Sequence, residues 1–332
     1  MRQAILTKTG ASRLSRWGYR AESFIDRFRP ARSSDDLMVD SYTGYATPEG
    51  VVVRGRVLTR RQLRATPLKP GLLTNLRAMV ALFLTREVSD VEVVVEGIIG
   101  HSDEEGYFSI RVPVTDPETT FLNVSLPKYG YECQAPVVVP HPQARIGIIS
   151  DIDDTILQTG AWSILRNLWT TLTGAVESRL IFADTAELIR LLQDGVNPVF
   201  YVSSSPWNLH SFLDAVFRHN EVPFGPKFLR ELGINETQFI KSSHGSHKGD
   251  AIDSIVAANP TLKFVLIGDT GQHDGKVYLD AIARHEGRII EVCLRGAGPL
   301  DIIDEQWADE IRATGVAFYS GATFEPLLTE TR

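Results

Sequence analysis

The segment SDIDDT at 150–155 follows an apolar run and offers two carboxylates two positions apart, Asp151 and Asp153. Residues two apart in an extended chain point the same way, so both side chains should face one pocket. Like charges this close repel each other, and the pair is stable only with a cation between the carboxylates or a proton on one of them. The spacing therefore predicts a site for metal-assisted or acid–base chemistry.

Two other segments offer groups that suit an anion. YVSSSPWN at 201–208 places Ser203, Ser204 and the backbone amides that follow them at the start of a predicted helix, where phosphate oxygens can be received. HGSHKGDAI at 244–252 places Lys248 near another helix start, as a compact positive charge. We expect these groups to bind a phosphoryl group.

A fourth segment, GDTGQHD at 268–274, adds Asp269 and Asp274, whose oxygens suit a hard cation. Each feature has an ordinary explanation by itself: an Asp after a strand is usually a turn or cap residue, a Ser-rich turn is usually only a turn, and a single Lys usually faces solvent. All four together, each at the end of an apolar segment, indicate one assembled site.

The elements that position these residues alternate along the chain. Apolar strands at 145–150, 197–203, 262–268 and 288–294 are separated by helical stretches such as 185–195 and 208–219. Strands that alternate with helices predict a parallel sheet covered on both faces, in which ligands lie beyond the carboxyl ends of the strands. Asp151, Asp153, Asp269 and Asp274 follow such ends, and Ser203 and Ser204 lie at another.

These segments resemble the haloacid dehalogenase-like phosphohydrolases, whose signatures read here as DIDDT, YVS, HK and GDTGQHD. More narrowly, SDIDDT, YVSSSPWNL and IGDTGQHD are similar to the actin-patch-associated phosphatidate phosphatase family. The likeness is specific over about 145–320, looser over 40–140, and shows no departure at the catalytic positions. It implies a doubly wound, HAD-like catalytic domain.

The resemblance also implies roles. Asp151 would attack phosphorus and form an aspartyl-phosphate, and Asp153 would serve as general acid and then base. Magnesium would be held by Asp151, the main chain at Asp153, and Asp269, with Asp274 nearby or acting through water. Ser203, with Ser204, and Lys248 would neutralise the transferred phosphoryl group. The expected reaction is dephosphorylation of phosphatidate to diacylglycerol.

Short β-rich runs separated by Gly, Pro, Asp and Glu fill residues 40–140 and predict a small antiparallel β-sandwich, interrupted by a helix over 70–87. The predicted organisation has three parts: a basic, helical segment at 1–38, a β-sandwich domain at 39–142 and the catalytic domain at 143–332. The β-rich domain carries no catalytic cluster, so we expect a structural or docking role for it.

Composition and charge limit the class of protein and the cellular location that we expect. The net charge of -7 argues against a nucleic-acid-binding protein, although residues 1–32 carry eight basic and two acidic side chains. That segment could lie on anionic lipid or pack as an ordinary surface helix. With no long apolar run and no secretory signal, we expect a cytoplasmic protein, with peripheral membrane contact as a further expectation.

Two tryptophans, Trp162 and Trp169, lie at helical spacing directly after the first motif. They could enter a membrane interface or pack as a small lid. Two other functions stay open at this point: a phosphatase for a soluble phosphomonoester or phosphoprotein, and a peripheral membrane or protein-binding module with a vestigial site. The intact set of Asp151, Asp153, Lys248 and Asp269 argues against the latter.

Overall fold

A computed structural model of the chain describes residues 37–59, 88–114, 116–158, 181–230, 244–271, 274–296 and 302–330, without the side chains of 244–246, 302–304 and 330. Leu37–Arg332 forms one compact unit. The helices predicted at the N-terminus, over 70–87 and around Trp162 and Trp169 lie outside the described residues. Within the described part, no helix is both long enough and apolar enough to cross a bilayer.

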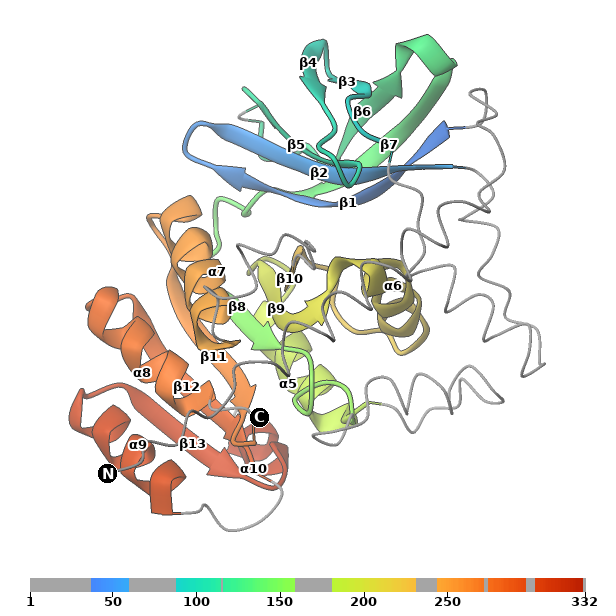
Figure 1. Cartoon of the computed structure of the whole chain (residues 1–332). Helices are drawn as coiled ribbons and strands as arrows, with labels where there is room; N and C mark the ends of the chain where they lie inside the picture. The colour runs from blue at the N-terminus through green and yellow to red at the C-terminus, as the bar shows by residue number, and fades with distance from the viewer. Residues whose placement is uncertain are drawn as a thin grey trace, which may run out of the picture. The chain divides into compact units, whose positions relative to one another are not determined.

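The first part of the unit is a seven-stranded sheet with the strand order β4-β3-β6-β7-β1-β2-β5 (Figure 1). Apolar residues alternate along its strands, and the inward set forms a core of Val, Leu, Ile and Phe side chains. The strands are β1 (Leu37–Thr47), β2 (Gly50–Thr59), β3 (Glu92–Val95), β4 (Ile98–His101), β5 (Tyr107–Val112), β6 (Phe121–Leu126) and β7 (Tyr131–Val138), with a 3-10 turn, η1, at Pro127–Tyr129.

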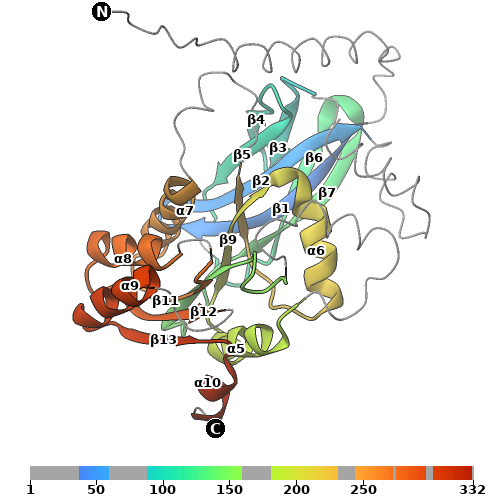
Figure 2. The same cartoon turned by 60° about the horizontal axis from the view of Figure 1, so that its bottom comes forward.

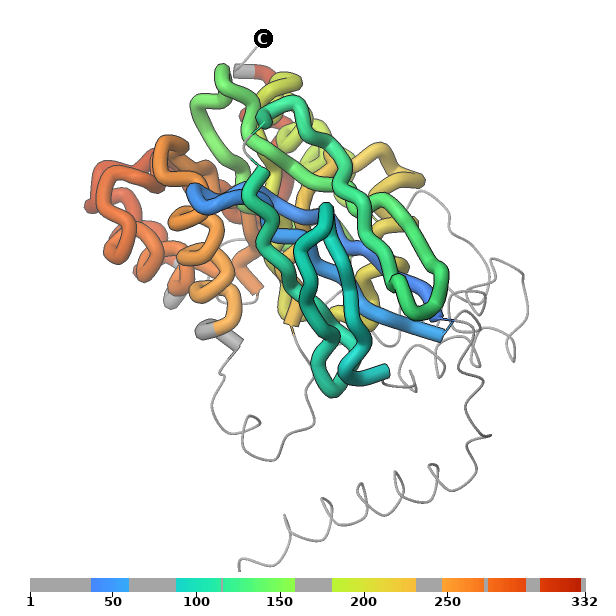
Figure 3. The backbone as a smooth tube through the Cα atoms, turned by 90° about the horizontal axis from the view of Figure 1, so that it is seen from above, coloured from blue at the N-terminus to red at the C-terminus, as the bar shows by residue number. Residues whose placement is uncertain are grey.

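The expectation of a purely antiparallel sandwich is wrong in one respect. Gly44 and Tyr45 of β1 pair with Val137 and Val138 of β7 in parallel, so the sheet is mixed. It also curls, because its two end strands, β4 and β5, contact each other around the shared core (Figure 3). This part is therefore closer to a barrel than to a two-layer sandwich.

The second part is a six-stranded sheet with the order β10-β9-β8-β11-β12-β13, in which every neighbouring pair is parallel. Its strands are β8 (Ile146–Asp151), β9 (Val199–Pro206), β10 (Lys227–Arg230), β11 (Lys263–Asp269), β12 (Ile289–Arg295) and β13 (Ala317–Gly321). The helices are α5 (Ala183–Gln193), the 3-10 turn η2 (Trp207–Leu209), α6 (His210–His219), α7 (His244–Ala258), α8 (Asp274–Arg284), α9 (Ile302–Ala313) and α10 (Glu325–Glu330).

Helices cover both faces of the parallel sheet, as the alternation of strands and helices predicts. Helices α5 and α6 lie on one face, and α7, α8 and α9 lie on the other (Figure 2). Apolar side chains of each set pack against the strands in a separate core. β8 lies inside the sheet between β9 and β11, and the chain proceeds from it first to one side and later to the other. The strand order thus switches direction at the strand that carries Asp151, where ligands bind in open α/β sheets.

The two parts meet at the segment that follows β9. Tyr42 of β1 stacks on Trp207 with ring centroids 4.5 Å apart, and Asp40 accepts a hydrogen bond from Ser211 Oγ at 3.0 Å. Arg56 of β2 donates to Asn208 Oδ1 at 3.0 Å. The mixed sheet therefore supports the chain immediately after Ser203.

Candidate active site

Asp151 ends β8, and the chain then turns back on itself. The amides of Ile156 and Leu157 donate to the carbonyl of Ile152 at 2.9 and 2.8 Å. Asp154 takes a left-handed conformation with φ of 59°, which Asp tolerates better than most residues. The turn brings Thr155 Oγ1 to within 3.2 Å of Asp151 Oδ2, so a hydroxyl donor holds the carboxylate in place.

Lys248, near the start of α7, reaches into the end of the sheet. Its Nζ lies 2.9 Å from Asp151 Oδ1 and 2.5 Å from Asp274 Oδ1. All three side chains are at least 96% buried, so water screens these charges little. The predicted approach of Lys248 to Asp151 is therefore present in the structure.

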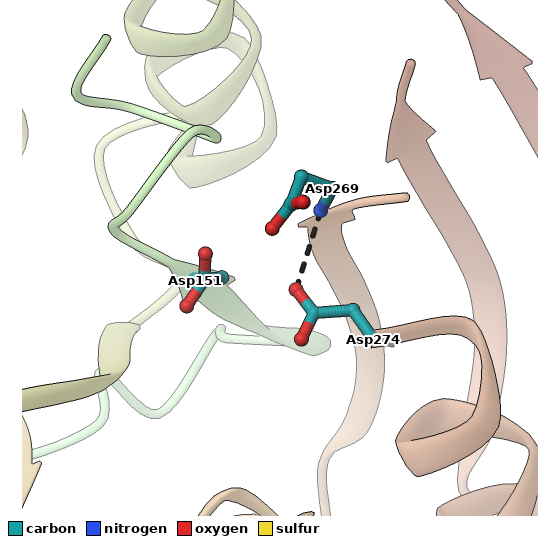
Figure 4. A group of neighbouring side chains, drawn as sticks. All are labelled: Asp151, Asp269 and Asp274. Carbon is teal, nitrogen blue, oxygen red and sulfur yellow. Dashed lines mark hydrogen bonds between the residues drawn. The ribbon is translucent and has the colours of Figure 1, made fainter. Parts of the chain in front are cut away.

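Asp269 and Asp274 complete the group (Figure 4). Asp274 Oδ2 accepts a hydrogen bond from the backbone N–H of Asp269 at 3.2 Å, and Asp269 Oδ1 accepts one from Gly271 at 2.6 Å. The close approach of Asp274 to β11 requires a glycine at 268, because a Cβ there would lie 2.5 Å from Asp274 Oδ2. The two acidic residues of this segment are thus fixed against each other by backbone contacts.

This arrangement is compatible with a metal ion. Asp151, Asp269 and Asp274 each direct one carboxylate oxygen to a common region, with those oxygens within 4.8 Å of one another. Among the described residues, three buried carboxylates face one ammonium group, that of Lys248, so their repulsion is only partly offset. Such an all-oxygen donor set suits a hard cation. The side chain of Asp153 is not part of this triad.

The three serines near the end of β9 point to two different sides, because side chains alternate along a strand. Ser203 and Ser205 both donate to Asp153 Oδ2, at 2.6 and 3.0 Å, and both are buried. Ser204, which alternates to the other side, makes no side-chain hydrogen bond within the described part of the chain. Ser205 was not among the predicted residues, although its position two after Ser203 on an extended strand was a usable signal.

The pKa values of the cluster follow from burial. Burial raises the pKa of Asp151 well above its usual range; Lys248 opposes this rise, and the neighbouring carboxylates add to it. Burial, with a contribution from Asp274, raises the pKa of Asp269 to about 7. Burial also raises the pKa of Asp153, against the hydrogen bonds from Ser203 and Ser205. Burial opposes the charge on Lys248, yet Asp151 and Asp274 outweigh it and raise the pKa of the ammonium group.

The cluster can therefore do three things. A carboxylate, Asp151, lies beside an ammonium group that could draw in an anion. A second carboxyl, Asp153, holds a proton more readily than an exposed aspartate does. The acidic triad can hold a divalent cation. Together these groups suit nucleophilic attack by a carboxylate on a phosphorus centre.

Comparison with known proteins finds a family model and two curated relatives that are similar to this region. Residues 146–296 match the family model described as phosphatidate phosphatase APP1, catalytic domain. Phosphatidate phosphatase APP1 of Saccharomyces cerevisiae is 27% identical over 231 residues, which cover 64% of this chain and 39% of that protein. The uncharacterized protein C29B5.04c of Schizosaccharomyces pombe is 29% identical over 168 residues, covering 50% of this chain and 27% of that protein.

The chain thus spans well under half of each of these two curated relatives. Among solved structures, the Pnkp1/Rnl/Hen1 complex aligns with a TM-score of 0.35 and 10% identity over 51% of this chain and 55% of that one. Asp151, Lys248, Asp269 and Asp274 all fall inside the segment matched by the family model. Residues 146–296 are therefore similar to the catalytic domains of phosphatidate phosphatases of the APP1 type.

Proposed function

We propose that the chain is a magnesium-dependent phosphatase that forms an aspartyl-phosphate on Asp151 and converts phosphatidate to diacylglycerol. The observation that carries this proposal is the 2.9 Å approach of the Lys248 ammonium to the Asp151 carboxylate, inside a buried triad of metal-type ligands. The yeast relative is a phosphatidate phosphatase, and this supports the choice of substrate. We also propose that the doubly wound sheet is of the HAD-like type.

Magnesium is the cation that this donor set favours. Asp151, Asp269 and Asp274 would hold it through carboxylate oxygens, together with the main-chain oxygen at Asp153. When bound, the ion would neutralise charge on the phosphoryl oxygens and orient them for in-line displacement. A cation also relieves the repulsion among the three carboxylates, which gives the site a physical reason to take one up.

The residues of the chain would then divide the work. An oxygen of Asp151 forms a bond to phosphorus while the bond from phosphorus to the leaving alkoxide breaks. Asp153, whose pKa is raised by burial, gives its proton to that alkoxide. Asp153 next takes a proton from the water that attacks the phosphorus of the phospho-aspartate, and this restores the carboxylate of Asp151.

Lys248 and the serines would position the phosphoryl group. The ammonium of Lys248 is held between Asp151 and Asp274, so it would stay beside the reacting oxygen as negative charge moves. In this structure the Ser203 hydroxyl is directed to Asp153 Oδ2, a bond that a phosphate oxygen would compete for. Ser205 holds the same oxygen and would keep Asp153 oriented when Ser203 turns away.

The mechanism is tested by isosteric removal of the nucleophile. Asp151→Asn should abolish magnesium-dependent hydrolysis of a chromogenic phosphate ester and should no longer trap label from a ³²P-labelled substrate. A matched control is Asp280→Asn, which changes an exposed carboxylate on α8, the helix that also carries Asp274. Wild-type turnover by the Asp151 variant, or a label that maps to another residue, would refute the mechanism.

The substrate is tested separately. Release of phosphate from phosphatidate in vesicles should exceed release from soluble phosphomonoesters and from a phosphopeptide at equal phosphate concentration. Equal or lower activity on vesicles would remove the lipid substrate and leave a phosphatase for soluble esters. The membrane contacts predicted for the basic N-terminus and for Trp162 and Trp169 remain predictions, since those residues lie outside the described ones.

A further inference from the structure

A cavity of about 570 Å³ lies between the mixed sheet and the α/β part, outside the aspartate cluster. One wall comes from β1, β2, β5 and the residues just after β4, and the other from β10, α7 and Trp207. Its lining includes none of Asp151, Asp153, Lys248, Asp269 or Asp274. The size exceeds that of a single ion and suits a small organic ligand.

The wall on the mixed sheet is polar because of strand register. Tyr42 of β1 is paired with Arg54 of β2, and Arg54 is paired with Ser109 of β5. Directly paired residues point to the same face, so these three side chains share the face that lines the cavity. The adjoining positions on β2, Val53 and Gly55, alternate to the other face, where Val53 joins the apolar core.

Arg54 is the centre of this wall and has no acidic partner among the described residues. Its guanidinium lies 4.5 Å from the ring centroid of Phe228, 4.9 Å from that of Tyr45 and 5.2 Å from that of Trp207. One terminal nitrogen donates to the carbonyl of Lys227 at 3.1 Å, and Nε is buried without a hydrogen-bond partner. Burial lowers the pKa of Arg54 to about 10, and no carboxylate opposes that effect.

Two of the described residues that line the cavity are acidic, Asp103 and Asp250, and neither neutralises the charge of Arg54. Asp103 and Asp250 are exposed to solvent, where their charges are screened. Asp103 Oδ1 already accepts the backbone N–H groups of Glu105 and Tyr107 at 2.9 and 2.8 Å. Arg54 is partly buried, and a charge that is partly removed from water without a counter-ion is costly, so an anion brought to Arg54 would be stabilising.

A second nitrogen at the cavity is also without a partner. Nε2 of His247, on α7, is buried and makes no hydrogen bond. His247 directly precedes Lys248, and Trp207 follows Ser205 by two positions. An occupant of the cavity would therefore contact residues adjacent in the chain to those of the aspartate cluster.

We propose that this cavity binds a phosphate ester, with the Arg54 guanidinium as the anchor for the phosphate and the rings of Tyr42, Trp207 and Phe228 as the surface for the apolar part of the ligand. The fork of a guanidinium matches the oxygens of a phosphate group. The phosphate could come from a lipid headgroup or from a soluble ester. This site is separate from the catalytic one and does not depend on the proposed reaction.

The test measures binding of inorganic phosphate and of dihexanoyl phosphatidate to the whole chain by equilibrium dialysis in EDTA. Removal of metal suppresses phosphate binding at the aspartate cluster, because the three carboxylates there outnumber the ammonium of Lys248 and repel an anion. It also prevents magnesium-dependent hydrolysis. Wild type should bind one ligand per chain, and Arg54→Met, which keeps an apolar stem, should weaken that binding at least about tenfold. Arg111→Met, which removes an exposed arginine from β5, is the matched control and should bind as wild type does.

The two probes separate the sources of the phosphate. Tighter binding of dihexanoyl phosphatidate than of inorganic phosphate identifies a lipid headgroup, and equal binding identifies the phosphate alone. Absence of saturable binding, or equal affinities in wild type and Arg54→Met, overturns the proposal. If Arg54→Met fails to fold, Ser109→Trp is the second variant, because the larger side chain fills the cavity and leaves Arg54 in place. Ser109→Trp should abolish ligand binding, and wild-type affinity in that variant would also overturn the proposal.

Discussion

The affinity for Mg²⁺ should depend on pH, because two of the carboxyl groups that would bind the ion have raised pKa values. Asp269 has a pKa of about 7 in the metal-free cluster, and the pKa of Asp151 is raised as well. A cation binds only the deprotonated carboxylate, so below pH 7 a proton must leave Asp269 before the ion can bind. Affinity should therefore fall as the pH falls, and it should level off above the pKa.

The size of the effect follows from the pKa. With Asp269 at about 7, most chains carry the proton at pH 6 and few carry it at pH 8. Competition by that single proton weakens the apparent Kd for Mg²⁺ by about tenfold between those pH values, or about 1.4 kcal/mol. The raised pKa of Asp151 acts in the same direction, so this figure is a lower bound.

Isothermal titration with Mg²⁺ measures both the Kd and the proton release, when the titration is repeated in two buffers of different ionisation enthalpy. At pH 6 binding should release at least about one proton per ion, and the number released should fall as the pH rises through the pKa of Asp269. The Asp280→Asn variant, changed on the exposed side of α8, should give the same curve as wild type. An unchanged Kd between pH 8 and pH 6, with no protons released, would refute the reasoning.

Three further predictions concern single side chains. Lys248→Met should lower kcat by roughly 10²–10³-fold on a chromogenic phosphate ester, since it removes the ammonium that lies 2.9 Å from Asp151 Oδ1; near-normal kcat would contradict this role. Ser205→Ala removes a hydrogen bond that lowers the pKa of Asp153. The basic limb of the plot of kcat/KM against pH should therefore move to higher pH by about half a pH unit to one pH unit. Ser204→Ala is the control and should leave that plot unchanged. Burial raises the pKa of Asp40 to about 6, so ionisation of this carboxyl destabilises the fold increasingly as the pH rises from 4 to above 6. In urea denaturation, Asp40→Asn should therefore raise the free energy of unfolding by up to about 3 kcal/mol at pH 7.5 and by little at pH 4. An equal gain at both pH values would contradict this.

Much of the candidate site could be predicted from the sequence. Its residues lie in short motifs, and the ends of parallel strands meet at one edge of the sheet in every fold of this class. Asp151 and Asp269 each end a strand of one parallel sheet, and such ends meet at one edge whatever the connections between them. Lys248 and Asp274 begin or lie near the start of helices that return from that edge. The roles assigned to these residues remain predictions that the experiments above address.

The sequence was less informative where packing over a distance decides the outcome. β10 and β13 were not predicted, since both are short and lie at the edges of the sheet, with polar residues among the apolar ones. The parallel pairing of β1 with β7 was also missed, because an alternating strand has the same pattern beside a parallel or an antiparallel neighbour. Arg54 carries no sequence signal at all: its lack of a counter-ion depends on the residues that fold around it.

The pairing of β1 with β7 also bears on how the chain is made. Ser41 Oγ on β1 lies 3.4 Å from Cys133 Sγ on β7, although they are 92 positions apart. On the ribosome the hairpin of β1 and β2 can close early, but the other edge of β1 must wait until β7 has emerged. Until β7 has been synthesised, the unpaired edge of β1 can pair with a strand of a second nascent chain. A chaperone that binds the nascent chain would therefore protect it most at that stage.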